Sequence, residues 1–429
     1  DWIPVNRFYQ KRMIGLLLAV MMVLLAACGG NTSSNSGKSD SGSPAPAASP
    51  SAAPADSGNA GGAEKKPIKI GMMVDTSGPL AISGQSEIDG LKLYLDSIGY
   101  QIDGHKVEVV YEDDGSNPQT ALRKYRKLVT SDKIDILVAP VSSAVLYALR
   151  DEVEKDKLPM IDVNAAGNEL SWSKKSDYVY RISISNWQNG TAGVDYLIKN
   201  VGKKAFTIGP DFPAGHEVLA SFKHEFEKAG GKVVAEVFPK MGTNDFASYL
   251  TQIAEAKPDF VFGFIPDASG IQFLKQYHEF GLEKSVKLTG TLEFADTLEM
   301  LPAADAAVGL IAATPYTPWL DNAVNKKFVE AHQKAYGKLP NFFTMEGYDS
   351  AIVIEKAVKE AGSADAAALI KVLPGITFDS PRGTIKIDPA THNPIQNFYV
   401  GEVVKQDGNN TFKVLETIKE VGMPDQPVK

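Results

Sequence analysis

Short apolar runs alternate with stretches of helical periodicity from Pro67 onward. Ile68–Val74 has the continuous apolar character of a buried strand, and Gln85–Ile98 carries its apolar residues at helical spacing. Asn117 followed by Pro118 predicts the start of another helix, since asparagine is a favoured N-cap and proline suits the first helical position. Repeated strand–helix–strand units of this kind predict parallel sheets that helices cover on both faces.

The same pattern starts again near Tyr180–Asn189 and gives a second α/β unit of similar size. Helical stretches return after it, and the tail from Gly383 has the alternation and Gly/Asn turns of antiparallel strands. We therefore predict an α/β protein with two doubly wound parallel-sheet lobes joined by hinge crossings. The strands expected within the two units are Ile68–Val74, Val107–Glu112, Ile134–Val138, Met160–Val163, Ala205–Gly209, Val233–Phe238, Asp259–Phe264 and Val286–Thr289.

The N-terminal segment has the pattern of a secretory signal. Three basic residues precede the apolar run Met13–Ala27, which is shorter than the roughly 20 residues of a comfortable transmembrane span. Leu25–Cys28 then looks like a bacterial lipobox, in which the cysteine is lipidated and becomes the first mature residue. Cys28 is the only cysteine of the chain. A plain secretory cleavage site with an incidental cysteine is the alternative.

Residues 29–66 are rich in Gly, Ser, Ala and Pro, and this composition predicts a flexible tether because it buries little apolar surface. We accordingly expect the chain to be anchored by lipid to the outer face of the cell membrane. The expected limits are a signal peptide with lipobox at 1–28, a tether at 29–66, a first lobe at 67–188 plus 316–375, a second lobe at 189–315 plus 376–421 and a tail at 422–429.

Composition and motifs argue against several functions. The formal net charge is −8 and Lys and Arg are scattered, so the chain lacks the basic footprint of a nucleic-acid-binding protein. The sequence has no G-x-G-x-x-G after the first strand, no P-loop and no G-x-S-x-G, and its six histidines form no H-E-x-x-H pair. We predict binding without catalysis, metal or cofactor. A metal cluster at Glu112–Asp114 and a cell-surface enzyme are the alternatives.

Ligands of open α/β sheets bind at the carboxyl ends of strands, where helix N-termini present unpaired N–H groups. In the first unit, Ser142 and Ser143 follow the third strand, and Asn164–Asn168 follow the fourth. Hydroxyls and free amides there suit a carboxylate, and an asparagine amide both donates and accepts. Ordinary helix capping and an ordinary Asn/Gly turn are the alternatives.

The second unit offers an aromatic residue and two acids at equivalent strand ends. Phe212 precedes a predicted helix and would stack on a ligand or fill the core of its own lobe. Asp267 would pair with an ammonium group or cap the next helix, and Glu293 is a second acid on the same side.

At these residues the chain resembles the branched-chain amino-acid-binding family of ABC-transporter receptors, which have the type I periplasmic binding fold. The likeness covers essentially 67–421 and rests on the order of several short motifs rather than on any one of them. These motifs are Ile70–Gly84, Val110–Pro118, Pro140–Ala144, Phe212–Gly215 and Gly347–Ala351.

The resemblance implies that amides and a serine at Ser142-Ser143 hold a ligand carboxylate and that the loop Asn164–Ala166 contacts the head group. It also implies that Ser83, in the loop after the first strand, and Tyr316, near a crossing, line the side-chain pocket. The expected ligand-binding residues are Ser83, Ser142, Ser143, Asn164, Ala165, Ala166, Phe212, Asp267, Glu293 and Tyr316.

Two positions depart from the amino-acid binders of that family, which usually carry threonine at the position of Ala166 and a hydroxyl residue at that of Val145. The expected function is capture of a small carboxylate, a branched-chain or other hydrophobic amino acid, by hinge closure for an ABC permease. The departures also favour an aromatic acid, an amide or a urea-like solute. A ligand sensor for a membrane receptor is a further alternative, and in each role we expect a monomer.

Overall fold

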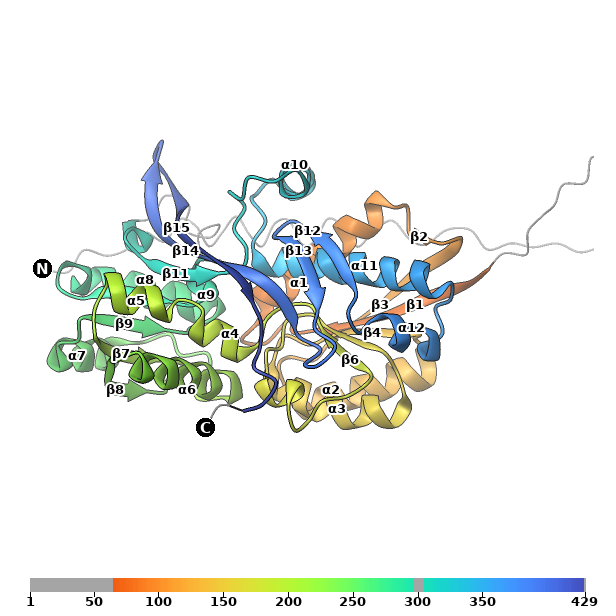
Figure 1. Cartoon of the computed structure of the whole chain (residues 1–429), viewed down its shortest axis with the longest axis horizontal. Helices are drawn as coiled ribbons and strands as arrows, with labels where there is room; N and C mark the ends of the chain where they lie inside the picture. The colour runs from red at the N-terminus through yellow and green to blue at the C-terminus, as the bar shows by residue number, and fades with distance from the viewer. Residues whose placement is uncertain (1–64, 296–304, 428–429) are drawn as a thin grey trace, which may run out of the picture. The chain divides into compact units, whose positions relative to one another are not determined.

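The computed structural model describes residues 65–295 and 305–427, and its elements form two α/β lobes as predicted (Figure 1). We call the six-stranded sheet with its helices the first lobe, and the larger sheet with its helices the second lobe. The predicted signal peptide, Cys28 and nearly all of the tether lie outside the described residues. Strand β1 begins at Lys65, so the last two residues expected in the tether belong to the sheet.

The first lobe has the strand order β2-β3-β1-β4-β5-β6, in which every neighbouring pair except β2–β3 is parallel. Its strands are β1 (Lys65–Val74), β2 (Gln101–Ile102), β3 (His105–Asp113), β4 (Ile136–Ala139), β5 (Met160–Asp162) and β6 (Val179–Arg181). Its helices are α1 (Ala81–Ser97), α2 (Pro118–Lys127), α3 (Ser143–Asp156), α11 (Phe342–Ala361) and α12 (Ala366–Val372).

Alternate residues of the central strand enter two different cores. Met72 packs in a cluster with apolar residues of α1, α11 and α12, whereas Met73 packs with apolar residues of α2 and α3. The sheet is therefore buried on both faces, which explains why its strands are continuously apolar in sequence. The predicted cap of α2 is confirmed, because Asn117 Oδ1 accepts the N–H groups of Gln119 and Thr120 at 3.0 Å each.

The second lobe has the order β12-β13-β14-β11-β10-β9-β7-β8, with β15 paired to β14. Strands β7 to β11 are parallel to their neighbours among themselves, and β11 to β15 pair antiparallel, as the Gly/Asn turns of the tail predict. Its strands are β7 (Lys204–Ile208), β8 (Lys232–Val237), β9 (Phe260–Gly263), β10 (Lys287–Gly290), β11 (Ile311–Thr314), β12 (Thr377–Ser380), β13 (Gly383–Ile387), β14 (Pro394–Gln406) and β15 (Asn409–Val421).

Helices of the second half of the chain connect the strands of this sheet and cover it.

Strand β11 of the sheet was not predicted from the sequence, because its four residues Ile-Ala-Ala-Thr carry too weak an apolar pattern. The core side chains of β12 and β13, such as Phe378 and Ile385, pack with the first lobe. The helices are α4 (Asn186–Thr191), α5 (Val194–Asn200), α6 (Pro213–Lys228), α7 (Ala247–Ala256), α8 (Asp267–Glu279), α9 (Leu292–Ala295) and α10 (Ala323–Tyr336).

Helices α1 and α11 approach each other backbone to backbone. A Cβ on Gly90 would lie 1.9 Å from the carbonyl oxygen of Thr344, and one on Gly347 would lie 1.9 Å from that of Glu87. Only glycine permits this distance at both positions. The close packing places the N-terminal turns of α11 beside the strand ends of the first lobe.

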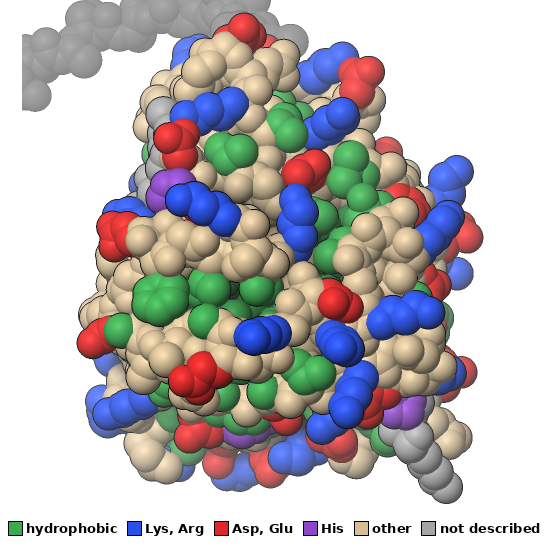
Figure 2. All heavy atoms as spheres, turned by 90° about the vertical axis from the view of Figure 1, so that its left-hand side faces the viewer, with side chains coloured by type: hydrophobic (Ala, Val, Ile, Leu, Met, Phe, Trp, Pro, Cys, Tyr) green, Lys and Arg blue, Asp and Glu red, His purple; other side chains and the backbone are tan. Residues whose placement is uncertain are grey.

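Acidic and basic side chains are interspersed on the face seen in Figure 2, as the scattered charges of the sequence suggest. Among the described residues, no helix is both long and apolar enough to cross a membrane.

Candidate functional site

A small cavity lies where the strand ends of the two lobes meet. Its volume is about 30 Å³, well below the 300–1,000 Å³ typical of ligand pockets, so this conformation is tightly closed. Most lining residues come from the segments after β1, β4, β5, β6, β7, β9 and β10, as expected for ligand sites of α/β sheets. The lining residues are Leu80, Ser83, Val141, Ser143, Asn164, Ala166, Ile184, Asn186, Phe212, Ala214, Phe264, Pro266, Glu293 and Phe343.

The first lobe contributes the polar groups predicted for its strand ends. Ser143 is the first residue of α3, whose first-turn N–H groups lack intrahelical partners by geometry. Asn164 follows β5, and its Nδ2 donates to Glu346 Oε2 at 2.7 Å. Ser83 lies in the first turn of α1 rather than in a loop, because the helix begins at Ala81, four residues earlier than predicted.

The second lobe contributes an aromatic wall and one acid. Phe212 lines the cavity and stacks on Phe264, with ring centroids 6.2 Å apart and planes at 16°. Glu293 accepts hydrogen bonds from the Thr291 hydroxyl and from Asn189 Nδ2, the latter at 3.0 Å. Burial raises the pKa of Glu293 to about 7, although both hydrogen bonds act to lower it.

Asp267 links the two lobes instead of lining the cavity. Its carboxylate accepts the Ser83 hydroxyl and the backbone N–H groups of Ile82 and Ser83, the latter two at 3.0 and 3.2 Å. It thus caps the N-terminus of α1, a helix of the opposite lobe, where no side chain of α1 itself serves as a cap. Burial raises the pKa of Asp267 to about 6.

Glu217 of α6 makes a second contact between the lobes. One oxygen accepts the Tyr147 hydroxyl of α3, and the other accepts the Asn168 N–H at 2.7 Å and Asn186 Nδ2 at 3.0 Å. Carboxylates of the second lobe therefore bond to the first lobe at two separate places on the closed cleft.

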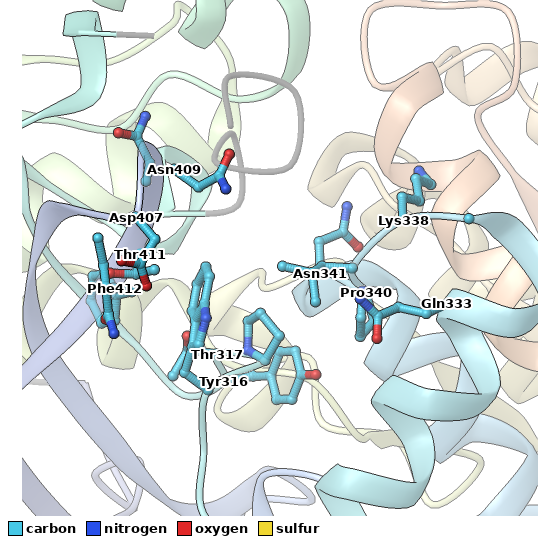
Figure 3. A pocket seen from close by; sticks show the side chains of 16 residues that line it. Tyr316, Thr317, Gln333, Lys338, Pro340, Asn341, Asp407, Asn409, Thr411 and Phe412 are labelled. Carbon is cyan, nitrogen blue, oxygen red and sulfur yellow. The ribbon is translucent and has the colours of Figure 1, made fainter. Parts of the chain in front are cut away.

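The remaining expected residues lie elsewhere. Ser142 and Ala165 are buried next to the cavity but do not line it. Tyr316 is buried, donates its hydroxyl to Asn325 Oδ1 at 3.0 Å, and lines a different pocket of about 620 Å³ (Figure 3). Side chains of the β14–β15 turn and of the α10–α11 loop face each other across that pocket. It is larger than the cleft, but it lacks the convergence of strand ends that places helix N-termini around a ligand.

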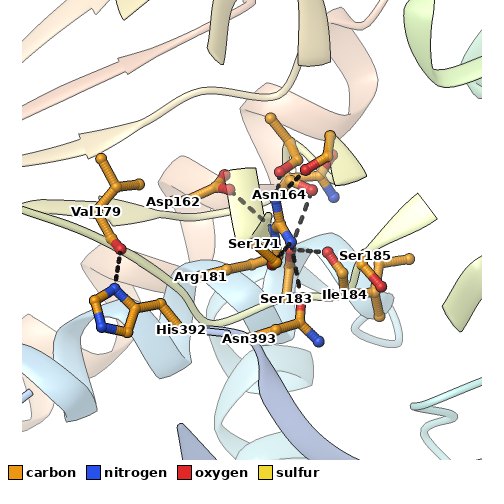
Figure 4. A network of polar contacts seen from close by, with 12 residues as sticks. Asp162, Asn164, Ser171, Val179, Arg181, Ser183, Ile184, Ser185, His392 and Asn393 are labelled. Atoms are coloured by element: carbon orange, nitrogen blue, oxygen red, sulfur yellow. Dashed lines mark hydrogen bonds and ion pairs between the residues drawn. The ribbon is translucent and has the colours of Figure 1, made fainter. Parts of the chain in front are cut away.

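A buried arginine fixes the loop that carries Asn164 and Ala166 (Figure 4). Arg181 donates Nε to Asp162 Oδ2 at 3.1 Å and Nη2 to the carbonyl oxygen of Gly167 at 2.7 Å. It also donates Nη1 to Asn393 Oδ1 at 2.9 Å, which ties this loop to the segment before β14. The polar residues of the first lobe therefore stand on a rigid base.

Several lining residues were missed from the sequence. Asn186 follows Ser185, whose capping box with Gln188 is a readable signal for a helix start. Phe343, which lines the cavity, and the buried Glu346, which bonds to the lining residue Asn164, have no such signal, since they lie on a helix far along the chain. At the acidic strand end Glu112–Asp114, Glu112 pairs with two lysines and Asp113 accepts the Ser77 hydroxyl; no group of possible metal ligands occurs among the described residues.

Comparisons with known proteins agree with this architecture. Residues 67–409 match the family model described as periplasmic binding protein. A Leu/Ile/Val-binding protein homolog 6 from Brucella suis is 29% identical over 83% of this chain and 93% of its own length.

Two solved structures of ABC-transporter solute-binding proteins from Rhodopseudomonas palustris are each 32% identical. One, in complex with 3,4-dihydroxybenzoic acid, has a TM-score of 0.79 and covers 83% of this chain and 98% of its own. The other, in complex with benzoate, has a TM-score of 0.77 and covers 82% and 98%. The chain belongs to the periplasmic binding protein family, in the branched-chain amino-acid group of ABC-transporter substrate-binding proteins.

Proposed function

We propose that this solute-binding protein captures a small hydrophobic carboxylate, most directly an aromatic acid, in the cleft between its lobes. The observation that carries the proposal is the composition of the cavity. The stacked pair Phe212–Phe264 provides an aromatic wall, Ser143 presents a hydroxyl at the N-terminus of α3, and no Lys or Arg is among the lining residues. A carboxylate would then be held by hydroxyl and amide donors and by the helix dipole.

Hinge motion is a necessary part of this proposal. The closed cavity is too small for an aromatic acid, so the lobes would separate to admit the ligand and close around it. We propose the lobe limits expected from the sequence, with the hinge in the segments that pass between the sheets. Arg382 ties two of these segments together, donating to the carbonyl oxygen of Ser183 at 3.2 Å and to Gln396 Oε1 at 2.6 Å.

A hydrophobic amino acid such as leucine is the second candidate, and Glu293 is the observation that favours it. A buried carboxylate at the cavity would pair with the ligand's ammonium group and would then regain a normal charge state. The Leu/Ile/Val-binding homologues support this candidate, whereas the benzoate-binding relatives support the first.

Delivery would follow capture without chemical change of the solute. In this proposal, the closed form docks on the permease of an ABC importer. Lipidation of Cys28 would hold the chain outside the membrane, with 29–66 as the tether; the lipobox pattern supports this part.

A thermal-shift screen of the purified protein tests the proposed function. A solute that binds only the folded state raises the unfolding midpoint. We expect a clear rise with a hydroxybenzoate and a smaller one with benzoate, and a rise with leucine, isoleucine or valine would favour the second candidate. No rise with any carboxylate would contradict capture of this class of solute.

A further inference from the structure

Two asparagines of the cavity have their amide groups oriented by buried or half-buried glutamates. Asn164 Nδ2 donates to Glu346 Oε2 at 2.7 Å, and Asn186 Nδ2 donates to Glu217 Oε2 at 3.0 Å. A carboxylate only accepts hydrogen bonds, so the nitrogen of each amide must face its glutamate. The carbonyl oxygen of each side chain therefore points away from the acid.

These two carbonyl oxygens receive no hydrogen bond from any described residue, although both asparagines line the cavity. A third asparagine shows the same arrangement, since Asn189 gives its Nδ2 to Glu293. Glu293 itself adds carboxylate oxygens to the lining. The polar side of the cavity is consequently rich in acceptors, and a ligand that fills the closed cleft would separate those acceptors from bulk water.

We propose that Glu346 and Glu217 are positioning residues that turn the acceptor oxygens of Asn164 and Asn186 toward the ligand. The cleft then selects, among small carboxylates, those that carry a further hydrogen-bond donor, a hydroxyl or amino group. An unmet buried acceptor is costly, so a site built to receive a donor rejects the analogue that lacks it. This inference rests on the proposed function and names the ligand class more narrowly.

Glu217 takes part both in orienting Asn186 and in the contact between the two lobes. The same carboxylate that orients Asn186 accepts the Tyr147 hydroxyl and the Asn168 N–H from the first lobe. Glu217 therefore bonds to Asn186 and to the first lobe at the same time in this closed conformation, so closure further constrains the residue that orients Asn186.

The test is isothermal titration calorimetry with ligand pairs of similar size that differ in the donor. The pairs are 3- and 4-hydroxybenzoate against the corresponding fluorobenzoates, and leucine against 4-methylpentanoate. In the best-bound pair, we expect the donor-bearing member to bind about 10- to 100-fold more tightly. Asn164→Leu should bring this ratio within about threefold of unity, and Glu346→Gln should lower it because a glutamine amide can donate to Asn164 Oδ1.

Asn200→Leu and Glu360→Gln, both on exposed helix ends, are the matched controls and should keep the wild-type ratio. A purely structural role for Glu346 would weaken both members of a pair equally and would overturn the proposal. Equal binding of both members of every pair to the wild-type protein would also overturn the proposal. This outcome needs no variant, so it holds even if a variant fails to fold. If no carboxylate of the panel binds, the proposed function itself is wrong and this inference falls with it.

Discussion

The two sides of the cleft are built in different ways. On the first lobe, Asn164 and Ala166 stand on a loop held by the buried Arg181, and the Asn164 amide is oriented by Glu346. On the second lobe, the lining consists mainly of apolar groups, with the stacked rings of Phe212 and Phe264 and the single acid Glu293. In the proposed function, the first lobe would therefore set the orientation of a ligand's polar groups, and the second lobe would cover its apolar body.

The contacts that join the two lobes differ from both sides of the cleft. Asp267 and Glu217 of the second lobe accept hydrogen bonds from the first lobe, so the proposed hinge motion would break these bonds as the cleft opens. The Arg181 network joins the loop after β5 to Asn393, in the segment before β14, and it lies beside the hinge segments and not across the cleft. We therefore expect it to persist when the cleft opens. Binding first to the preorganised lobe and closing afterwards is the order that this arrangement favours.

The largest effect is expected from Gly347→Ala, which disrupts the close packing of α1 against α11 in the first lobe. The new Cβ would lie 1.9 Å from the carbonyl oxygen of Glu87, and backbone atoms cannot move aside cheaply. We expect a loss of about 3 kcal/mol or more in the free energy of unfolding, measured by urea denaturation. Gly362→Ala, where the added Cβ meets no neighbouring atom but φ is 62°, is the control and should cost less.

Removal of the interlobe cap should mainly affect closure. Asp267→Ala leaves the Ile82 and Ser83 N–H groups and the Ser83 hydroxyl without their acceptor, a loss of about 1–3 kcal/mol that falls on the closed state. Ligand affinity should therefore drop by about 10- to 100-fold in calorimetry. Asp267→Asn keeps one acceptor oxygen and should bind more tightly than Asp267→Ala. Unchanged affinity in Asp267→Ala would show that this contact does not support the closed form.

Truncation of the aromatic wall should separate the two candidate ligands. Phe212→Ala removes one ring of the stack, and we expect about a tenfold loss of affinity for an aromatic acid, worth about 1.4 kcal/mol. The loss for leucine should be smaller, because an aliphatic side chain gains no ring stacking. Equal losses for both ligands would mean that Phe212 acts only as apolar bulk.

The smallest effect concerns the pH dependence of stability. The pKa of Glu293 is raised to about 7 in the folded chain, so the folded state holds a proton that the unfolded state releases above its ordinary pKa. The resulting stability is present below that ordinary value and is lost as pH rises through about 7. We expect Glu293→Gln to reduce the fall in melting temperature between pH 5.5 and pH 8 by a few degrees, on the order of 3 °C.

Two buried histidines change the stability of the protein in the opposite direction over part of this pH range. Burial lowers the pKa of His332 and of His392, so their contribution is lost as pH falls below their usual value. Both are present in wild type and variant alike, and the difference between the two proteins isolates Glu293. An identical pH profile for Glu293→Gln would rule out the raised pKa.

Local signals in the sequence predict the fold and part of the site. Apolar runs and helical spacing identify the two α/β units, and the strand-end rule points to Ser143, Asn164 and Phe212, which line the cavity. Asp267 is a residue whose role local signals in the sequence cannot predict. Its partner Ser83 lies 184 residues away and in the other lobe, so no local pattern separates a cap on its own helix from a cap on α1.

The same limit applies to the residues that were missed. Glu346 is a buried acid of α11, and it meets Asn164 of the loop after β5, which lies 182 residues away in the sequence. Tertiary packing, and not residue spacing, determines which polar group meets which.

A crystal structure of the protein with its best-bound carboxylate tests the central claim most directly. The account predicts a ligand in the closed cleft, with its carboxylate within hydrogen-bond distance of Ser143 and its apolar body against Phe212. A ligand in the larger pocket beside Tyr316, or one whose carboxylate faces the second lobe, would contradict the division of roles between the two lobes.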